Sequence, residues 1–200
     1  MNPIALSADA GLAALGCITL NLALGLLIAM RYSPRRCWPH RRINLFRLHN
    51  LSGYAVLAVS VLHPSLLLLA SHPRFRVLDL VYPLHSPSQP LENTIGAIAL
   101  YGIAIVVVTS YFRLRLGRRL WKALHFVIYA AALALFWHSL FTDPHLQNTP
   151  LNPFDGEKVF VELCCLAIVV FSGLRWRYAM RKPRARAESK EPRENAVVEA

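Results

Sequence analysis

The stretch LGRRLWKALHFVIYAAALALFWHSLF, residues 116–141, decides the fold of this chain of 200 residues. After a basic start it continues as an apolar run of the length that an α-helix needs to cross a membrane, about 20 residues. A lone apolar strand could not satisfy its backbone hydrogen bonds in lipid, so the run predicts a transmembrane helix. It carries His125 and His138 in a setting where ionisable side chains are rare.

The rest of the chain has the same character. It is 55% hydrophobic and 16% charged, with a mean hydropathy of +0.38, whereas average soluble domains are about 45–50% apolar and about 25% charged. This composition argues against a water-soluble enzyme, a disordered chain or a disulfide scaffold. We predict an all-α fold, an integral membrane bundle of about five transmembrane helices, with a sixth possible. The predicted spans are 11–30, 48–70, 95–112, 120–141 and 159–174, the last beginning about one turn earlier.

The charges predict the orientation of the bundle. Six Lys or Arg residues lie between spans one and two, five between span three and the first turn of span four, and eight after span five, which makes 19 of the 22 in the chain. Because cytoplasmic loops are enriched in Lys and Arg, we expect the N-terminus outside and the C-terminus in the cytoplasm. Spans two and four then run in the same direction. The net charge of +11 lies in these bands, so we expect no nucleic-acid partner.

We expect two parts, a transmembrane domain over 1–180 and a disordered cytoplasmic tail over 181–200, whose charges are mixed in sign. The first span lacks the basic residues that precede the apolar core of a signal peptide, so we expect a retained helix. No glycine-rich phosphate loop follows a predicted strand, and we therefore expect no nucleotide-binding domain.

Four histidines fall inside the predicted spans, His49 and His63 on span two and His125 and His138 on span four. Their spacings of 14 and 13 residues correspond to roughly 20 Å along a helix, so one metal ion cannot serve both members of a span. Because the two spans are parallel, His49 and His125 should lie at one level near the cytoplasm. His63 and His138 should lie at a second level near the outside. Each level offers two imidazoles, which suit the axial positions of a haem iron. The 13-residue spacing is about 3.6 turns, so either span four is distorted or its two rings point in different directions.

Three arginines lie near the inner pair in the sequence, Arg47, Arg118 and Arg119. Haem propionates are anionic, so these side chains are candidate contacts for propionates or for an electron donor. Setting the membrane topology is the simpler role for each of them.

Other classes of function stay open at this point. Membrane histidines also form interhelical hydrogen bonds, relay protons or bind metals, so a histidine-dependent metal or proton transporter is an alternative. A transporter should also offer acidic partners within its spans, and only Glu162 comes close. A haem-binding membrane anchor that transfers no electrons is a third class.

The two histidine pairs resemble the ferric reductase-like transmembrane domain, which ferric reductases and NADPH oxidases share. The similarity covers about 42–176 and is strengthened by the run Gly117, Trp121, His125, Tyr129 and His138. The stretch 116–138 is also similar to the haem-binding membrane subunit of the bacterial periplasmic methionine sulfoxide reductase system.

The resemblance implies that His49, His63, His125 and His138 are the axial ligands of two haem b groups, which makes 1–180 a haem-binding domain. It implies that electrons cross from the cytoplasmic side to the outside. Ferric reductases and NADPH oxidases carry a flavin and nicotinamide domain; in this chain flavin is possible but is not indicated by the sequence.

We therefore expect an oxidoreductase component whose donor is a separate cytoplasmic flavin reductase, flavoprotein or quinol. The acceptor would be an extracytoplasmic protein or ferric iron. We expect the protein to lie in the lipid of a bacterial inner membrane. Whether the chain is itself an enzyme stays open. The second similarity implies an alternative, a subunit that delivers electrons to a periplasmic reductase.

Overall fold

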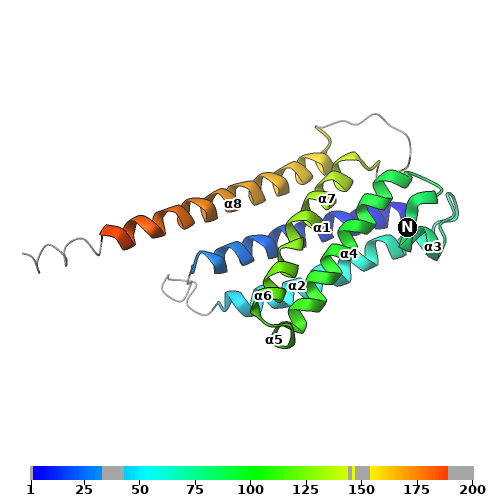
Figure 1. Ribbon diagram of the computed structural model, residues 1–200. Helices are drawn as coiled ribbons and strands as arrows, with labels where there is room; N and C mark the ends of the chain where they lie inside the picture. Colours follow the sequence, from blue (N-terminus) through cyan, green and yellow to red (C-terminus); the bar gives the residue numbers. More distant parts are fainter. Residues whose placement is uncertain (1, 33–42, 144–145, 147–153, 189–200) are drawn as a thin grey trace, which may run out of the picture.

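The computed structural model describes residues 2–32, 43–143, 146 and 154–188, and every regular element within them is helical (Figure 1). In this part of the chain five helical segments are long and apolar enough to cross a membrane, which confirms the all-α fold and the number of spans. They are α1 (Pro3–Ala29), α2 (Leu45–Leu66) with its continuation η2 (Leu67–Leu69), α4 (Pro90–Tyr111), α6 (Arg118–His125) with α7 (Val127–Phe141), and α8 (Gly156–Glu188). The short elements are α3 (Val77–Val81), η3 (Pro83–His85) and α5 (Arg113–Leu116).

Local capping signals set where these helices begin. The side chain of Asn2 accepts from Ile4 N at 3.0 Å, and that of Asn44 accepts from Arg47 N at 3.1 Å, so both asparagines are N-caps. Pro90 occupies the first position of α4, where its missing N–H costs nothing. Such polar first turns lie outside the apolar runs, which is why α4 begins five residues before the predicted 95.

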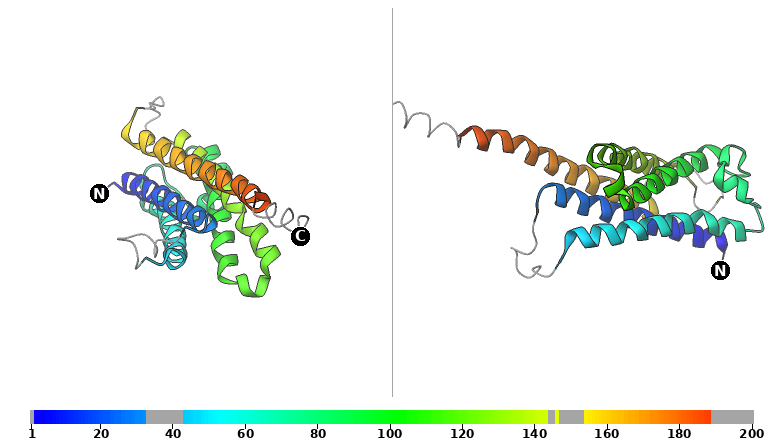
Figure 2. Two further views of the ribbon diagram at one scale, coloured as in Figure 1. Left: turned by 90° about the vertical axis from the view of Figure 1, so that its left-hand side faces the viewer. Right: turned by 60° about the horizontal axis from the view of Figure 1, so that its bottom comes forward.

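The spans form one bundle in which α1 packs against both α2 and α8, and α4 packs against α7 (Figures 1 and 2). Gly102 lets α4 and α7 approach closely, because a Cβ at this position would lie 2.8 Å from the Cβ of Ala131. The buried core side chains come from all of these helices. They are Leu15, Ile18, Leu22, Val56, Ile103, Val106, Ile128, Ala131, Ala132, Val161 and Cys164.

Large apolar side chains also cover the outside of the bundle. Ile98, Leu133 and Val169, from three different spans, are 58%, 72% and 61% exposed. Exposed apolar area on this scale is unfavourable in water and is what a helical bundle presents to lipid. Together with the five spans, this surface identifies an integral, multi-pass membrane protein.

The fourth span is not one regular helix. Around Phe126, between α6 and α7, three-residue hydrogen bonds appear beside the four-residue ones: Phe126 N donates to both Ala123 O and Lys122 O at 3.2 Å, and Tyr129 N donates to Phe126 O at 3.1 Å. A turn of this kind winds more tightly than an α-helix. The distortion predicted as one explanation of the 13-residue spacing is therefore present, and it brings that spacing closer to a whole number of turns.

The last helix differs from its prediction. α8 begins at Gly156, a turn before 159 as expected, but it continues to Glu188 and runs beyond the rest of the bundle (Figure 1). Residues 181–188, which the sequence analysis assigned to the tail, are the last residues of α8 in the structure. The remainder of the predicted tail, 189–200, lies outside the described residues.

The two ends of the bundle differ. At one end, which we call the capped end, the segment 70–89 with α3 and η3 folds over the helices beside the start of α1 (Figure 1). Asn93 Nδ2 of α4 ties this segment down by donating to Ser86 Oγ at 3.0 Å and to Ser88 O at 2.8 Å. The opposite end, which we call the basic end, carries the arginines of α5 and of the first turns of α2 and α6.

Candidate functional site

The four histidines of the spans meet as two pairs, each with one ring from α2 and one from the fourth span. At the capped end the ring centroids of His63 and His138 are 6.2 Å apart, with an angle of 68° between the ring planes. At the basic end the centroids of His49 and His125 are 6.3 Å apart, with an angle of 73°. α2 and α6–α7 are therefore parallel, and these pairs correspond to the predicted outer and inner pairs.

Both separations suit one metal ion between two imidazoles. A metal bound by two ring nitrogens at about 2.0–2.1 Å from each puts the ring centroids a little over about 6 Å apart. Within the described residues no group of three or more His, Cys, Asp or Glu side chains comes together as a metal site. Each level thus offers two imidazoles, and two is the number of ligands that a haem iron can take from a protein.

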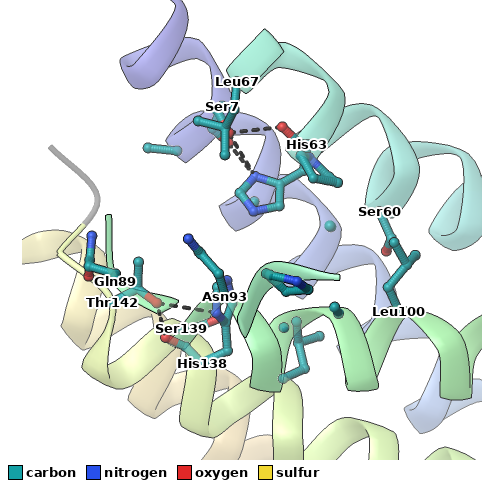
Figure 3. A pocket seen from close by; sticks show the side chains of 18 of the residues that line it. Ser7, Ser60, His63, Leu67, Gln89, Asn93, Leu100, His138, Ser139 and Thr142 are labelled. Carbon is teal, nitrogen blue, oxygen red and sulfur yellow. Dashed lines mark hydrogen bonds between the residues drawn. The ribbon is translucent and has the colours of Figure 1, made fainter. Parts of the chain in front are cut away.

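At the capped end the Nδ1 atoms of both rings bind backbone carbonyls of neighbouring helices. His63 Nδ1 lies 2.7 Å from Ser7 O, and His138 Nδ1 lies 2.8 Å from Glu92 O. A carbonyl only accepts, so each Nδ1 carries the proton and each Nε2 keeps its lone pair. Ser7 Oγ also donates to His63 O at 2.9 Å, and Thr142 Oγ1 lies 3.2 Å from His138 Nδ1. Figure 3 shows the contacts of Ser7 with His63 and of Thr142 with His138.

At the basic end only one of the two rings is held in this way. His49 Nδ1 donates to Asn21 O at 3.1 Å, while Asn21 Nδ2 donates back to His49 O at 2.7 Å. His125 Nδ1 instead lies 3.2 Å from Ser110 Oγ, an oxygen that also accepts from Trp121 Nε1 at 3.3 Å. The ring centroids of Trp121 and His125 are 5.2 Å apart.

This arrangement is the one that metal-binding histidines use in proteins. A ligating imidazole almost always donates its second ring N–H to a carbonyl, carboxylate or water, which fixes its tautomer and orientation. Three of the four rings are fixed through a carbonyl and the fourth approaches a hydroxyl. All four therefore have a structural basis for offering Nε2 as a ligand.

The capped-end pair lines a large cavity between α1, α2, α4, α7 and α8 (Figure 3). Its empty volume, including the solvent of its open mouth, is about 1310 Å³. Apolar side chains dominate the wall, and a few polar ones converge on it. The polar ones are Ser7, Ser60, Asp79, Gln89, Asn93, Ser139, Thr142, Asp143, Glu157 and Lys158. This lining, with two imidazoles on it, suits a mainly apolar cofactor with polar edges.

Three glycines, which we did not single out from the sequence, let the imidazoles lie against helix backbones. A Cβ on Gly11 would be 3.0 Å from His63 Cε1, and one on Gly25 would be 3.2 Å from His49 Cε1. A Cβ on Gly96 would be 2.9 Å from both Cε1 and Nδ1 of His138. The sequence did hold a signal, because Gly11 and Gly25 are 14 residues apart, the spacing of His49 and His63.

The charged candidates are less directly placed. Arg47, Arg118 and Arg119 are exposed at the basic end, in the first turns of α2 and α6, so their contact with a propionate or donor stays a prediction. The sequence analysis did not predict a role for Lys158, which is 6% exposed and lines the cavity. Its Nζ donates to Ser139 O at 2.9 Å and Thr142 O at 2.7 Å, which caps the end of α7 just beyond His138.

Comparison with known proteins gives one match. A family model described as "Ferric reductase like transmembrane component" matches residues 10–136. The matched segment contains His49, His63 and His125 and ends two residues before His138. No curated protein and no solved structure matches the chain.

Proposed function

This chain belongs to the ferric reductase-like transmembrane family, and we propose that it is a haem b-containing electron-transfer protein with two haem sites stacked across the membrane. His49 and His125 would hold one haem, and His63 and His138 the other. The observation that supports this most directly is the presence of two imidazole pairs with centroids 6.3 and 6.2 Å apart.

Each part of the surrounding structure has a task in this proposal. A bound haem supplies reversible one-electron chemistry at its iron. The carbonyls of Ser7, Asn21 and Glu92 fix the tautomers, so that Nε2 of each held ring is available. The two imidazoles at each level would both bind the haem, which would leave no site at the metal for a substrate and so favours electron transfer.

The arrangement favours haem over a bare metal ion. Zinc in structural sites takes about four protein ligands, and in catalytic sites about three. Each level here supplies two imidazoles, which is sufficient only for an ion that brings its other ligands with it. This comparison supports a redox role over a histidine-dependent transporter.

For the donor and acceptor we propose classes only. The distribution of Lys and Arg supports a cytoplasmic location for the basic end, so a separate flavin reductase, flavoprotein or quinol would donate near His49 and His125. The acceptor would meet the capped end outside the membrane, as ferric iron or as a protein such as a periplasmic methionine sulfoxide reductase. A bacterial inner membrane is the location we propose.

An absorption spectrum of the purified protein, with and without dithionite, tests the proposal, together with pyridine haemochrome quantitation. We expect two haem b per chain in the wild type. His49→Ala and His138→Ala should each lose one haem, because each removes one axial ligand from a different level.

The matched control is His85→Ala, since His85 is an exposed histidine at the capped end that belongs to neither pair. This variant should retain both haems. A wild-type protein that binds no haem after expression with ample haem would refute the redox role.

A further inference from the structure

Three of the four imidazoles are held by the same hydrogen-bonding arrangement. In each case Nδ1 donates to the carbonyl of a residue on the neighbouring helix, and the residue four positions later is glycine. In an α-helix the N–H of that later residue bonds the same carbonyl, so its side chain would stand beside the oxygen. Glycine leaves the oxygen open to the ring. The carbonyl and glycine pairs are Ser7 with Gly11, Asn21 with Gly25, and Glu92 with Gly96.

The fourth imidazole, His125, departs from this pattern at one residue. Gly25 follows Gly11 by 14 positions on α1, and the residue that follows Gly96 by 14 positions on α4 is Ser110. The carbonyl four residues before Ser110 is that of Val106, and the Cβ of a serine stands where the other sites have none. His125 Nδ1 meets Ser110 Oγ at 3.2 Å instead.

The hydroxyl is a weaker partner for this ring than a carbonyl would be. Ser110 Oγ already accepts the N–H of Trp121 at 3.3 Å, so its acceptor capacity is shared between the two rings. A strong acceptor at Nδ1 makes an imidazole more basic and a better electron donor to a metal at Nε2. A more electron-rich ligand stabilises oxidised iron and lowers the reduction potential, one of the levers by which proteins tune haem.

From this geometry we propose that Ser110 is a positioning residue that, with Trp121, raises the reduction potential of the basic-end haem above the value that glycine at this position would give. The inference rests on the proposed function, because it needs haem between His49 and His125. It gives the chain one means of distinguishing the two sites.

The test is a spectroelectrochemical titration of the full, haem-loaded chain, with pyridine haemochrome quantitation to confirm two haems. Ser110→Gly should lower the midpoint potential of one component, because loss of the Cβ opens the carbonyl of Val106 to the ring; the hydroxyl of Thr109, 3.3 Å from this carbonyl, binds Ile105 O more closely at 2.6 Å. Ser110→Ala removes the hydroxyl and keeps the Cβ, so it should raise the potential of the same component. His49→Ala identifies that component as the one lost.

A second variant tests the same idea without changing residue 110. Trp121→Phe removes the competing N–H and should lower the midpoint potential of the basic-end haem, since Ser110 Oγ then accepts from His125 alone. The control is Thr94→Ala, which removes a hydroxyl from the other end of α4, where Thr94 Oγ1 donates to Pro90 O at 2.6 Å. It should leave both potentials unchanged.

The outcomes distinguish a failure of the role proposed for Ser110 from a failure of the proposed function. Two haems with unchanged potentials in Ser110→Gly, Ser110→Ala and Trp121→Phe would overturn the role of Ser110 and leave the proposed function standing. A shift in the same direction in Ser110→Gly and Ser110→Ala would also overturn it, because Ser110 would then only fill space. A wild type without haem would instead refute the proposed function, and the inference with it.

Discussion

Ser7 illustrates how much a single residue fixes at one imidazole. Its carbonyl accepts from His63 Nδ1 at 2.7 Å, and its hydroxyl donates to His63 O at 2.9 Å. Both the ring and the backbone of His63 are thereby tied to α1. Ser7 is 2% exposed, so water does not compete for these hydrogen bonds. The ring is held in place before any ligand arrives, which is the condition for a precise binding site.

The glycine beside each held ring gives a prediction at the same scale. In Gly96→Ala the new Cβ would lie 2.9 Å from His138 Cε1 and Nδ1, so the ring must move. Overpacking of this kind costs about 1–3 kcal/mol, which corresponds to roughly five- to more than a hundredfold weaker haem binding at the capped end. Haem content and haem release measured on the purified variant check this.

The matched control is Gly173→Ala on α8, because nothing lies within 4 Å of a Cβ at Gly173. It should bind both haems as the wild type does. Equal haem release in the two variants would show that the space at Gly96 is not what holds the ring.

At the scale of elements, the break at Phe126 explains how two histidines 13 residues apart on the fourth span can reach the same two levels as two histidines 14 residues apart on α2. α2 places His49 and His63 about four turns apart, and the tight turn between α6 and α7 adds twist to the shorter spacing of the fourth span. For the position of His138, the rotation of α7 relative to α6 about the helix axis is therefore as important as the length of the two helices.

Inserting one alanine between Phe126 and Val127 tests this. The insertion would make the spacing 14 but rotate α7 by about 100° relative to α6, which turns His138 away from the cavity. We expect the capped-end haem to be lost and the basic-end haem to remain, as measured by haemochrome quantitation and potentiometric titration.

Phe126→Ala is the control, since it keeps the chain length and replaces a side chain that is 54% exposed. It should retain two haems. An insertion variant that also keeps two haems would show that the span tolerates a rotation of α7 relative to α6.

The sequence was sufficient for the five spans because each is an apolar run, but not for their ends, where the N-cap Asn44 and the first-turn proline Pro90 extend the helices. The pairing of the histidines followed from their spacing and from the parallel direction of two spans. Ser7 and Gly11 could not be predicted as partners of His63, because that requires the register of α1 against α2, which depends on packing between the helices.

At the scale of the whole molecule, the charge distribution makes the two ends unequal. The basic end carries exposed arginines on α2, α5 and α6, whereas the capped end is covered by the segment 70–89. The positive-inside rule then predicts the basic end in the cytoplasm, which sets the direction of electron transfer in the proposed function.

Cysteine labelling in intact cells checks this orientation. In a chain whose native cysteines are replaced, a membrane-impermeant maleimide should label Ser71→Cys, an exposed position in the segment that covers the capped end. Arg115→Cys, exposed at the basic end, should react only after the cells are permeabilised. The reverse pattern would show that electrons enter from the outside.

The stacking of the two histidine pairs along α2 also has an electrical consequence. An electron that moves from the level of His49 to that of His63 travels about 20 Å of a hydrocarbon core about 30 Å thick. Such a step is electrogenic, because a full crossing is worth about 2.3 kcal/mol per 100 mV of membrane voltage. In a cell that is negative inside, the voltage would drive electrons outward, and each turnover would partly discharge it unless an ion moved in compensation.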